Sequence, residues 1–280
     1  MSESAKLPLP QFRRLGQTSR RDAWWVQPAG VFAGLMAFIV YSTWAAHQGD
    51  HYWLASGGAD YLSPFYSPEI FGSSPHSWFG EPPAWLMRVW PSFLPFSPAI
   101  LILWAPGGFR LTCYYYRGAY YKAFWADPPS CAVGEPAFRR KRYRGEHSFP
   151  LILQNIHRYF LFIAIGFIFL LFYDAYRAFW FLGIDGRRGL GVGVGTIVLL
   201  INPILLSLYI FGCHTLRHIM GGKKDCISSC PKAMQGAYRG VTCLNRRHML
   251  FAWLSLFWVG FADAYVRLCS MGLISDWRLL

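Results

Sequence analysis

The stretch FPLILQNIHRYFLFIAIGFIFLLFY, residues 149–173, decides the fold. It is almost wholly apolar and long enough to cross the hydrocarbon core of a bilayer, about 30 Å thick, as one α-helix. A helix is expected because every backbone N–H and C=O group within lipid must find its hydrogen-bond partner inside the segment. Four further stretches meet the same test, and the five predicted spans cover residues 28–46, 93–116, 149–173, 190–213 and 249–268.

The composition favours lipid over water as the solvent of this chain. Of its 280 residues, 54% are hydrophobic and only 15% are charged, whereas soluble domains carry roughly 25% charged residues. The net charge of +13 lies between the apolar runs, so no nucleic-acid partner is expected. The sequence predicts an all-α, polytopic membrane protein: a basic segment of residues 1–27, then a single bundle of five transmembrane helices over residues 28–280.

The second predicted span is unusual in its proline and glycine content. It contains Pro95, Pro98 and the cluster Pro106-Gly107-Gly108. Proline removes a backbone donor and distorts a helix interior. We therefore expect this span to be kinked and to pack on neighbours that satisfy its freed backbone groups.

Lys and Arg are distributed unevenly between the loops, and this bias decides which side of a membrane protein faces the cytoplasm. Residues 1–27, 117–150 and 214–247 hold five, seven and seven of them, against five in the loops on the other side. The N-terminus and both long basic loops are therefore predicted to be cytoplasmic, in a multi-pass protein of the cell membrane. A basic inner face suits anionic lipid head groups or an acidic partner.

Unusual residues gather at one depth once this orientation is fixed. Cys113, His157 and His248 fall at the inner ends of three different predicted spans. A fourth span ends in CHTLRH, which adds Cys213, His214 and His218. Ionisable residues within a membrane are costly and usually functional, and Cys with His is a ligand set for iron and zinc. Four helices thus bring two thiols and four imidazoles to one inner layer.

Cationic and phenolic side chains lie beside these candidate ligands. They are Arg110, Arg158, Arg217 and the run Tyr114, Tyr115 and Tyr116. Guanidinium groups at this level stabilise thiolates, an anionic cluster or a quinone oxygen, and the tyrosines add hydroxyl donors. An apolar ring with two carbonyl oxygens fits such a site.

Each of these residues also has a simpler interpretation. Tyrosines concentrate at membrane interfaces, a buried Cys is often only a small apolar side chain, and His248 beside two arginines suits lipid phosphate. The convergence of His157, His218 and both thiols from separate helices favours a cofactor site over these interpretations.

The remaining cysteines give a weaker signal. Cys226 and Cys230 have a C-x₃-C spacing without a second pair, which is poor evidence for a metal. Together with Cys243 and Cys131 they are expected to be free thiols in a reducing cytoplasm. Cys269, near the outer end of the fifth span, is expected to be structural.

Four stretches resemble a known family. They are LILWAPGGFRLTCYYYRGAYYKAFW (101–125), FPLILQNIHRYF (149–160), CHTLRHIMGG (213–222) and LNRRHMLFAWLSL (244–256). In this order they are similar to the membrane-anchor, cytochrome b-like subunit of succinate dehydrogenase (respiratory complex II), in the single-chain, five-helix form of mycobacteria and other actinobacteria. Residues 1–27 and 48–92 carry little of the resemblance.

The resemblance implies a role in electron transport. Two soluble partners are expected: a flavoprotein that oxidises succinate and an iron-sulfur protein docked on the cytoplasmic face. This chain would be the non-flavin membrane subunit that hands the electrons to quinone, with menaquinone as the expected species. Arg110, Tyr116, Arg217 and His248 are the expected quinone contacts. A higher oligomer of the complex is left open.

The resemblance also bears on the cofactor. Many five-helix anchors hold two b-type haems through four intramembrane histidines, but the first span here has no buried His and the second offers Cys113 instead. The mycobacterial branch is associated with a membrane-embedded, Rieske-type [2Fe-2S] cluster, which has two Cys on one iron and two His on the other. Cys113 and Cys213 would supply the thiols, while His157, His214, His218 and His248 compete for the two imidazole places.

Three alternatives stay open on the sequence alone. One is a single haem b held by two of the same histidines, for instance His157 and His218. The second is a small-solute transporter, although inverted repeats and paired interrupted helices are absent from the sequence. The third is a purely structural membrane anchor.

Overall fold

The computed structural model describes residues 17–54, 58–127, 153–183, 186–222 and 226–280. The chain divides into two compact units. The smaller consists of Met1–Ala37 and Tyr114–Ile152, and the larger of Phe38–Cys113 and Leu153–Leu280. The first long helix passes from one to the other.

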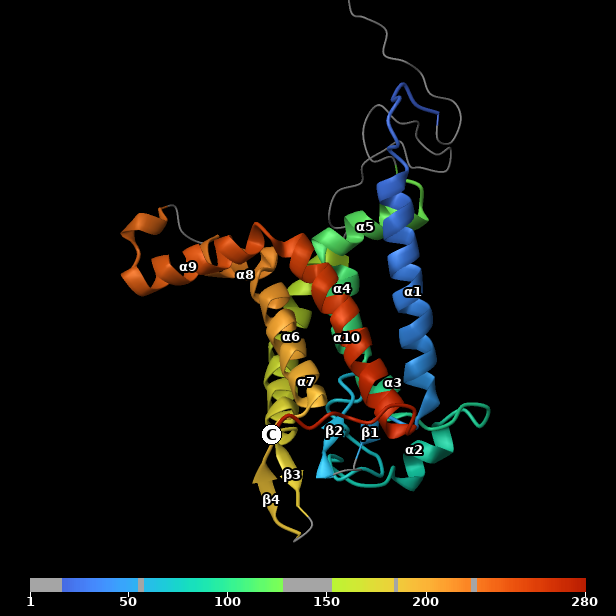
Figure 1. The fold of residues 1–280 in the computed structure, drawn as a ribbon. Helices are drawn as coiled ribbons and strands as arrows, with labels where there is room; N and C mark the ends of the chain where they lie inside the picture. Colours follow the sequence, from blue (N-terminus) through green and yellow to red (C-terminus); the bar gives the residue numbers. More distant parts are fainter. Residues whose placement is uncertain (1–16, 55–57, 128–152, 184–185, 223–225) are drawn as a thin grey trace, which may run out of the picture. The chain divides into compact units, whose positions relative to one another are not determined.

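Four long apolar helices dominate the described residues (Figure 1). They are α1 (Val26–Gln48), α6 (Leu153–Arg177), α7 (Val194–Phe211) and α10 (His248–Ser270). Each is long and apolar enough to cross a membrane, so four of the five predicted spans are found within a few residues of their expected limits. Large apolar side chains such as Phe169, which is 70% exposed, point away from the protein. Such exposure is stable in lipid but not in water.

The predicted span 93–116 is not a single helix. It is divided into α3 (Pro98–Ile102) and α4 (Trp104–Thr112), and its last residues belong to α5 (Tyr114–Phe124) in the smaller unit. Pro98 occupies the first turn of α3, where its missing N–H costs nothing. Residue Cys113, with φ −62° and ψ 134°, ends α4 in an extended conformation. The count of five spanning helices therefore stays a prediction.

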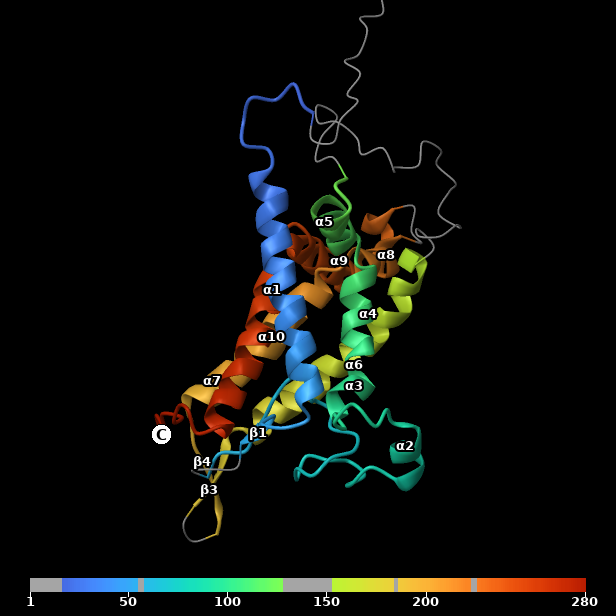
Figure 2. The same ribbon diagram turned by 90° about the vertical axis from the view of Figure 1, so that its right-hand side faces the viewer.

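The larger unit is a bundle built around α7. This helix packs along both α10 and α6, and α4 packs along α6 (Figure 2). Gly108 makes the last contact possible, because a Cβ at this position would overlap the Phe160 ring. The indole of Trp258 on α10 also donates a hydrogen bond to the Val198 carbonyl of α7.

Short helices and strands lie at both ends of this bundle. At one end lie α2 (Ala84–Val89) and two antiparallel strand pairs, β1 (Trp53–Leu54) with β2 (Tyr61–Leu62) and β3 (Trp180–Leu182) with β4 (Arg188–Leu190). At the other end α8 (His214–Gly221), η2 (Ile227–Ser229) and α9 (Lys232–Asn245) form a helical hairpin that turns sideways from α7. The sequence predicted only a basic loop there.

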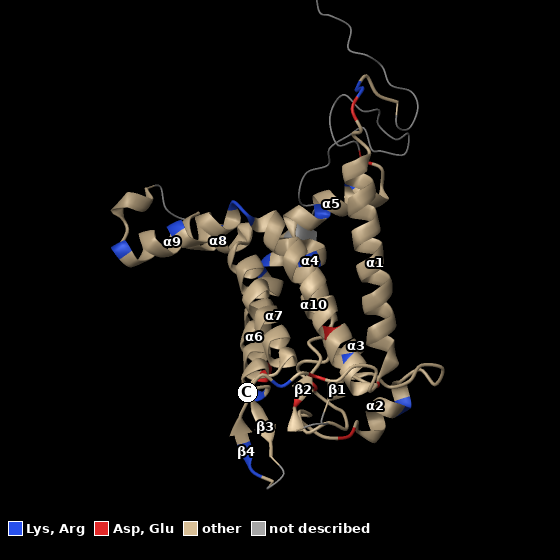
Figure 3. Cartoon of the chain, in the orientation of Figure 1, with Lys and Arg blue, Asp and Glu red and all other residues tan. Residues whose placement is uncertain are grey.

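The acidic residues of the larger unit that the structure describes collect at the strand end, as Figure 3 shows, whereas described basic residues occur at both ends. A buried network at the strand end joins Asp60 to His76 at 2.5 Å and to Arg177 at 2.8 Å. Burial alone would lower the pKa of His76, but the nearby carboxylates of Asp174 and Asp60 outweigh it and raise that pKa. The assignment of the α8–α9 end to the cytoplasm stays a prediction from the charge count.

Candidate cofactor site

Two thiols and two imidazoles meet in the larger unit, where α4 and α7 end. The Cys113 sulfur lies 3.5 Å from Nε2 of His248, and the Cys213 sulfur lies 3.1 Å from Nε2 of His157. All four side chains are buried. They come from four separate stretches of the chain, in accordance with the layer expected from the sequence.

The two cysteines occupy equivalent positions in the backbone. Cys113 is the single residue between α4 and α5, and Cys213 lies between α7 and α8. Their dihedral angles are nearly the same, with φ/ψ of −62°/134° and −66°/139°. Each thiol therefore leaves the chain at a break in the helix, where the backbone bends. The Cys213 sulfur also accepts a hydrogen bond from the backbone N–H of Thr215 at 3.3 Å.

Thr112 fixes the orientation of His157. The Thr112 hydroxyl donates its proton to the Gly108 carbonyl at 2.7 Å and lies 2.8 Å from Nδ1 of His157. Because that single proton is already committed, the hydroxyl accepts a hydrogen bond from Nδ1–H. The lone pair of Nε2 is then directed at Cys213. Proteins commonly orient a metal-binding His through a hydrogen bond at the ring nitrogen that does not bind the metal.

Aromatic rings hold both imidazoles from the side. The His157 ring stacks on Phe109 with centroids 4.5 Å apart, and the His248 ring stacks on Tyr209 at 4.9 Å. Arg110 lies over Tyr209 at 4.9 Å and donates hydrogen bonds to Ser255 and to the Ala252 carbonyl. A partly buried positive charge is thus one ring away from His248.

The donor set fits a group with two metal ions better than a single ion. In the part of the chain that the structure describes, no three or more His, Cys, Asp or Glu side chains surround one point as a mononuclear site requires. Instead there are two separate thiol–imidazole pairs. A Rieske-type [2Fe-2S] group takes two thiolates at one iron and two imidazoles at the other, and the two cysteines and two histidines of these pairs together supply that donor set.

The remaining predicted site residues lie on α8 and α5. His214 and His218 are exposed on α8, because the chain bends at Cys213 and carries them away from the bundle. Arg217 donates a hydrogen bond to Thr242 of α9 and lies over the Tyr238 ring. Tyr116 is buried on α5 in the smaller unit.

An apolar cavity of about 350 Å³ opens between α1, α4, α6, α7 and α10 of the larger unit. Arg110 contributes a charged group to its wall, and Ser42, Thr43 and His47 contribute polar ones. Most of the remaining lining is aliphatic or aromatic, including Phe38, Ala164, Leu206 and Val259. Sequence reasoning missed this cavity, because its lining residues look like ordinary apolar span residues.

The remaining described cysteines do not contribute to the site. Cys226 and Cys243 are exposed and Cys230 is partly exposed. Cys269 is buried in a separate apolar cluster with Tyr61, Phe181 and Val266. Cys131 lies outside the described residues.

Long apolar helices with exposed apolar faces, and a buried group of thiols and imidazoles where these helices end, define a membrane-embedded helical protein with a candidate cofactor site. The model of the actinobacterial succinate dehydrogenase subunit SdhC matches residues 26–272, so the chain belongs to this family. It is therefore the membrane part, and not the catalytic part, of a succinate dehydrogenase complex. This confirms the resemblance drawn from the four sequence stretches.

A solved structure supports the same family. The chain is 39% identical to a chain of the Mycobacterium smegmatis Sdh1 complex in the apo form, with a TM-score of 0.81. The match covers 99% of this chain and 97% of that chain. No curated protein matches the sequence.

Proposed function

We propose that this subunit transfers electrons within the membrane to a quinone by means of a [2Fe-2S] cluster held by Cys113, Cys213, His157 and His248. The observation that carries the proposal is the pair of buried thiol–imidazole contacts at 3.5 and 3.1 Å. When bound, the cluster would supply a one-electron carrier whose potential is raised by imidazole ligands relative to four-cysteine clusters.

The chain's own residues hold and shield such a group. Cys113 and Cys213 direct their thiols inward from two helix breaks, and Thr112 keeps Nε2 of His157 unprotonated. The stacked rings of Phe109 and Tyr209 keep water away from the imidazoles.

The proposed electron acceptor is an isoprenoid quinone, with menaquinone as the expected species, bound in the apolar cavity. A quinone combines a large apolar body with two carbonyl oxygens, which suits a cavity with few polar groups. Arg110 connects the two sites, because it lines the cavity and also lies over the ring that covers His248. Of the four quinone contacts predicted from the sequence, Arg110 is the one that lines this cavity in the described residues.

The proposed partners are the flavoprotein and the iron-sulfur subunit of succinate dehydrogenase. The basic end formed by α8 and α9 is the side on which they would dock, in the cytoplasm, while lipids surround the spans. The similar mycobacterial chain is part of a complex, Sdh1. Membership of the same family supports an equivalent assembly for this chain.

Replacement of Cys113 tests the cluster. In the purified complex, Cys113→Ser should abolish the iron and acid-labile sulfide bound by this subunit and the corresponding EPR signal. Cys269→Ser is the matched control, because Cys269 is equally buried but lies in a separate cluster. If the parent complex instead shows a sharp Soret band that Cys113→Ser removes, the cofactor is haem b. Unchanged iron in Cys113→Ser would refute the proposed ligand.

Filling the cavity tests the quinone site. Leu206→Trp projects an indole into the cavity, whereas Leu205→Trp changes the neighbouring residue of α7, which does not line it. The first variant should raise the KM for quinone about tenfold or more without changing succinate oxidation by an artificial dye. Equal effects of the two variants on the KM would place the quinone elsewhere.

A further inference from the structure

A buried ion pair lies within α10, about four turns beyond His248. Asp263 has no exposed surface and Arg267 is 3% exposed, and the Arg267 Nε atom lies 3.4 Å from the carboxylate. Two further donors reach the same carboxylate: the Tyr41 hydroxyl of α1 at 2.6 Å and the Ser63 hydroxyl. A charged pair in a membrane-spanning helix is costly and is retained where it has a role.

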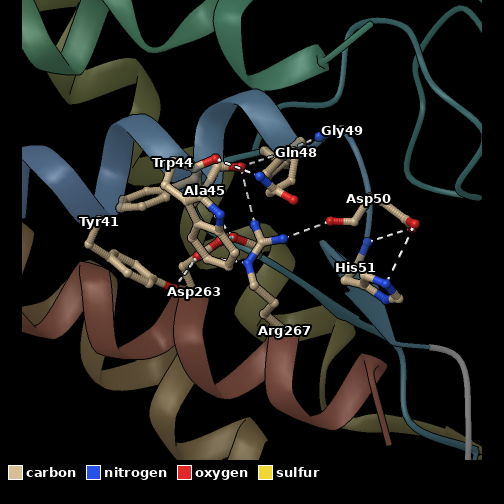
Figure 4. A network of polar contacts seen from close by, with 12 residues as sticks. Tyr41, Trp44, Ala45, Gln48, Gly49, Asp50, His51, Asp263 and Arg267 are labelled. Atoms are coloured by element: carbon tan, nitrogen blue, oxygen red, sulfur yellow. Dashed lines mark hydrogen bonds and ion pairs between the residues drawn. The ribbon is translucent and has the colours of Figure 1, made fainter. Parts of the chain in front are cut away.

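The pair attaches α10 to the end of α1, as Figure 4 shows. Arg267 donates hydrogen bonds to the Ala45 carbonyl at 3.3 Å and to the Asp50 carbonyl at 2.8 Å. Its guanidinium also lies 5.3 Å from the centre of the Trp44 ring. The last carbonyl groups of a helix lack partners within the helix. One side chain of α10 therefore caps the end of α1.

The attached part of α1 is also a wall of the apolar cavity. Phe38, Ser42 and Ala46 line the cavity from α1, and Val259, one turn before Asp263, lines it from α10. A Cβ placed at Gly260 of α10 would lie in ordinary van der Waals contact with the rings of Phe38 and Tyr41, at 3.7 to 3.9 Å, so the two helices lie close together here. The spacing of α1 and α10 therefore sets the width of the cavity at this wall.

We infer that Tyr41, Asp263 and Arg267 form a clamp that holds the second half of α1 at a fixed distance from α10 and thereby positions the cavity for its ligand. This inference rests on the proposed function in one respect, namely that the ligand is a quinone. The clamp residues do not line the cavity and are not members of the thiol–imidazole pairs. They are positioning residues, and Tyr41 connects the two helices through one hydrogen bond.

Removing the Tyr41 hydroxyl tests the clamp. Tyr41→Phe keeps the ring but deletes the hydrogen bond to Asp263, so the intact complex should show a KM for quinone about three- to tenfold higher. The turnover at saturating quinone and the dye-linked oxidation of succinate should not change. The matched control is Tyr265→Phe, because Tyr265 on α10 donates at 2.6 Å to Asp276 and does not line the cavity.

The separation of α1 and α10 tests the clamp by a measurement that does not depend on quinone. Spin labels at Val40→Cys and Leu254→Cys, both exposed positions, measure the separation of α1 and α10 once Cys131, Cys226, Cys230 and Cys243 are replaced by Ser. Tyr41→Phe should broaden or shift the distance distribution, and Tyr265→Phe should leave it as in the parent. An unchanged distribution with an unchanged KM overturns the clamp.

The two proposals fail in different ways. If Leu206→Trp raises the KM but Tyr41→Phe alters neither the KM nor the distance, the quinone site stands and the clamp falls. If Tyr41→Phe alters the distance but neither variant changes the KM, the clamp stands as a helix attachment and the cavity does not bind quinone. A parallel loss of dye-linked activity in Tyr41→Phe would indicate a general assembly defect and would overturn the positioning role.

Discussion

Thr112 shows how one hydroxyl directs a candidate ligand. It donates to the Gly108 carbonyl and accepts from Nδ1 of His157, so the other ring nitrogen faces Cys213. Nothing in the sequence marked Thr112, because its role depends on the bend that brings α4 against α6. The two cysteines and two histidines were predictable as members of one layer, since Cys and His are rare in spans, but the sequence did not separate His157 and His248 from His214 and His218.

Thr112→Val should weaken cofactor binding without unfolding the subunit. Valine has nearly the same shape but cannot accept the Nδ1–H hydrogen bond, so the His157 ring loses its preferred orientation. Loss of such a contact typically costs about 10- to 100-fold in metal affinity. Iron content of the purified complex under mild chelation checks the expectation. Thr112→Ser, which restores the hydroxyl, should recover the parent value, and failure to recover it would count against this role.

His76 gives the loop region at the strand end a pH dependence. It is buried between Asp60 and Asp174, which raise its pKa above the ordinary value of about 6.5. Because the folded pKa is the higher one, its stabilising effect is complete below about pH 6.5 and is lost as the pH rises through the folded pKa. Arg177 and Arg188 face the same carboxylate of Asp60 and keep their charge throughout.

The contribution of Asp60 has the opposite sign. Burial alone would raise the pKa of Asp60, but hydrogen bonding with His76 and the nearby Arg177 charge hold that pKa below its usual range. Its stabilising effect is present above about pH 4 and is lost as the pH falls further. His76→Gln should therefore lower the Tm of the complex most between about pH 4.5 and 6.5. A Tm difference that grows above about pH 8 would contradict this assignment.

At the scale of helices and strands, the lengths of the apolar stretches predicted the spans well. They did not predict where a helix is interrupted. Four long helices were predictable because their apolar stretches exceed what any soluble core helix needs. The stretch 93–116 was expected to bend, but its division at Leu103 and Cys113 depends on packing against α6. The helices α8 and α9 were missed because a basic, low-hydropathy stretch was taken for a loop. The bend at Cys213 also explains why His214 and His218 do not join the buried pairs.

Two neighbouring glycines of α4 provide a matched test of the α4–α6 contact. A Cβ at Gly108 would overlap the Phe160 ring, whereas a Cβ at Gly107 meets nothing within 4 Å. Gly108→Ala should destabilise the subunit by about 1–3 kcal/mol through overpacking. Gly107→Ala should leave stability unchanged or raise it by up to about 1 kcal/mol, because alanine favours the helix. Thermal unfolding of the two purified variants measures the difference, and equal Tm values would refute the close contact.

At the scale of the whole molecule, the unequal distribution of Lys and Arg predicts a cytoplasmic α8–α9 end. The exposed thiols of Cys226 and Cys243 mark this end. In intact cells, a membrane-impermeant maleimide should not label them, and it should do so after permeabilisation. A variant with Leu273→Cys, an exposed position near the other end of α10, should be labelled in intact cells when the exposed native cysteines are replaced. The reverse pattern would invert the topology.

The cavity and the clamp belong to this largest scale, and neither was predictable from the sequence. Both arise where α1 meets α10, from residues more than 200 positions apart. The sequence shows Asp263 and Arg267 only as charges in an apolar run. Their partner is the end of another helix, which only the folded arrangement brings within reach.

The equivalent positions of Cys113 and Cys213 restrict how this protein adapts to bilayers of different thickness. Each thiol lies within two residues of the end of a helix, whose register determines where the sulfur points. One residue added to α4 or α7 would rotate the thiol by about 100° and displace it by about 1.5 Å. The lengths of these helices are thus constrained by the thiol–imidazole pairs, and hydrophobic mismatch must be met by tilting the bundle or by the flanking side chains.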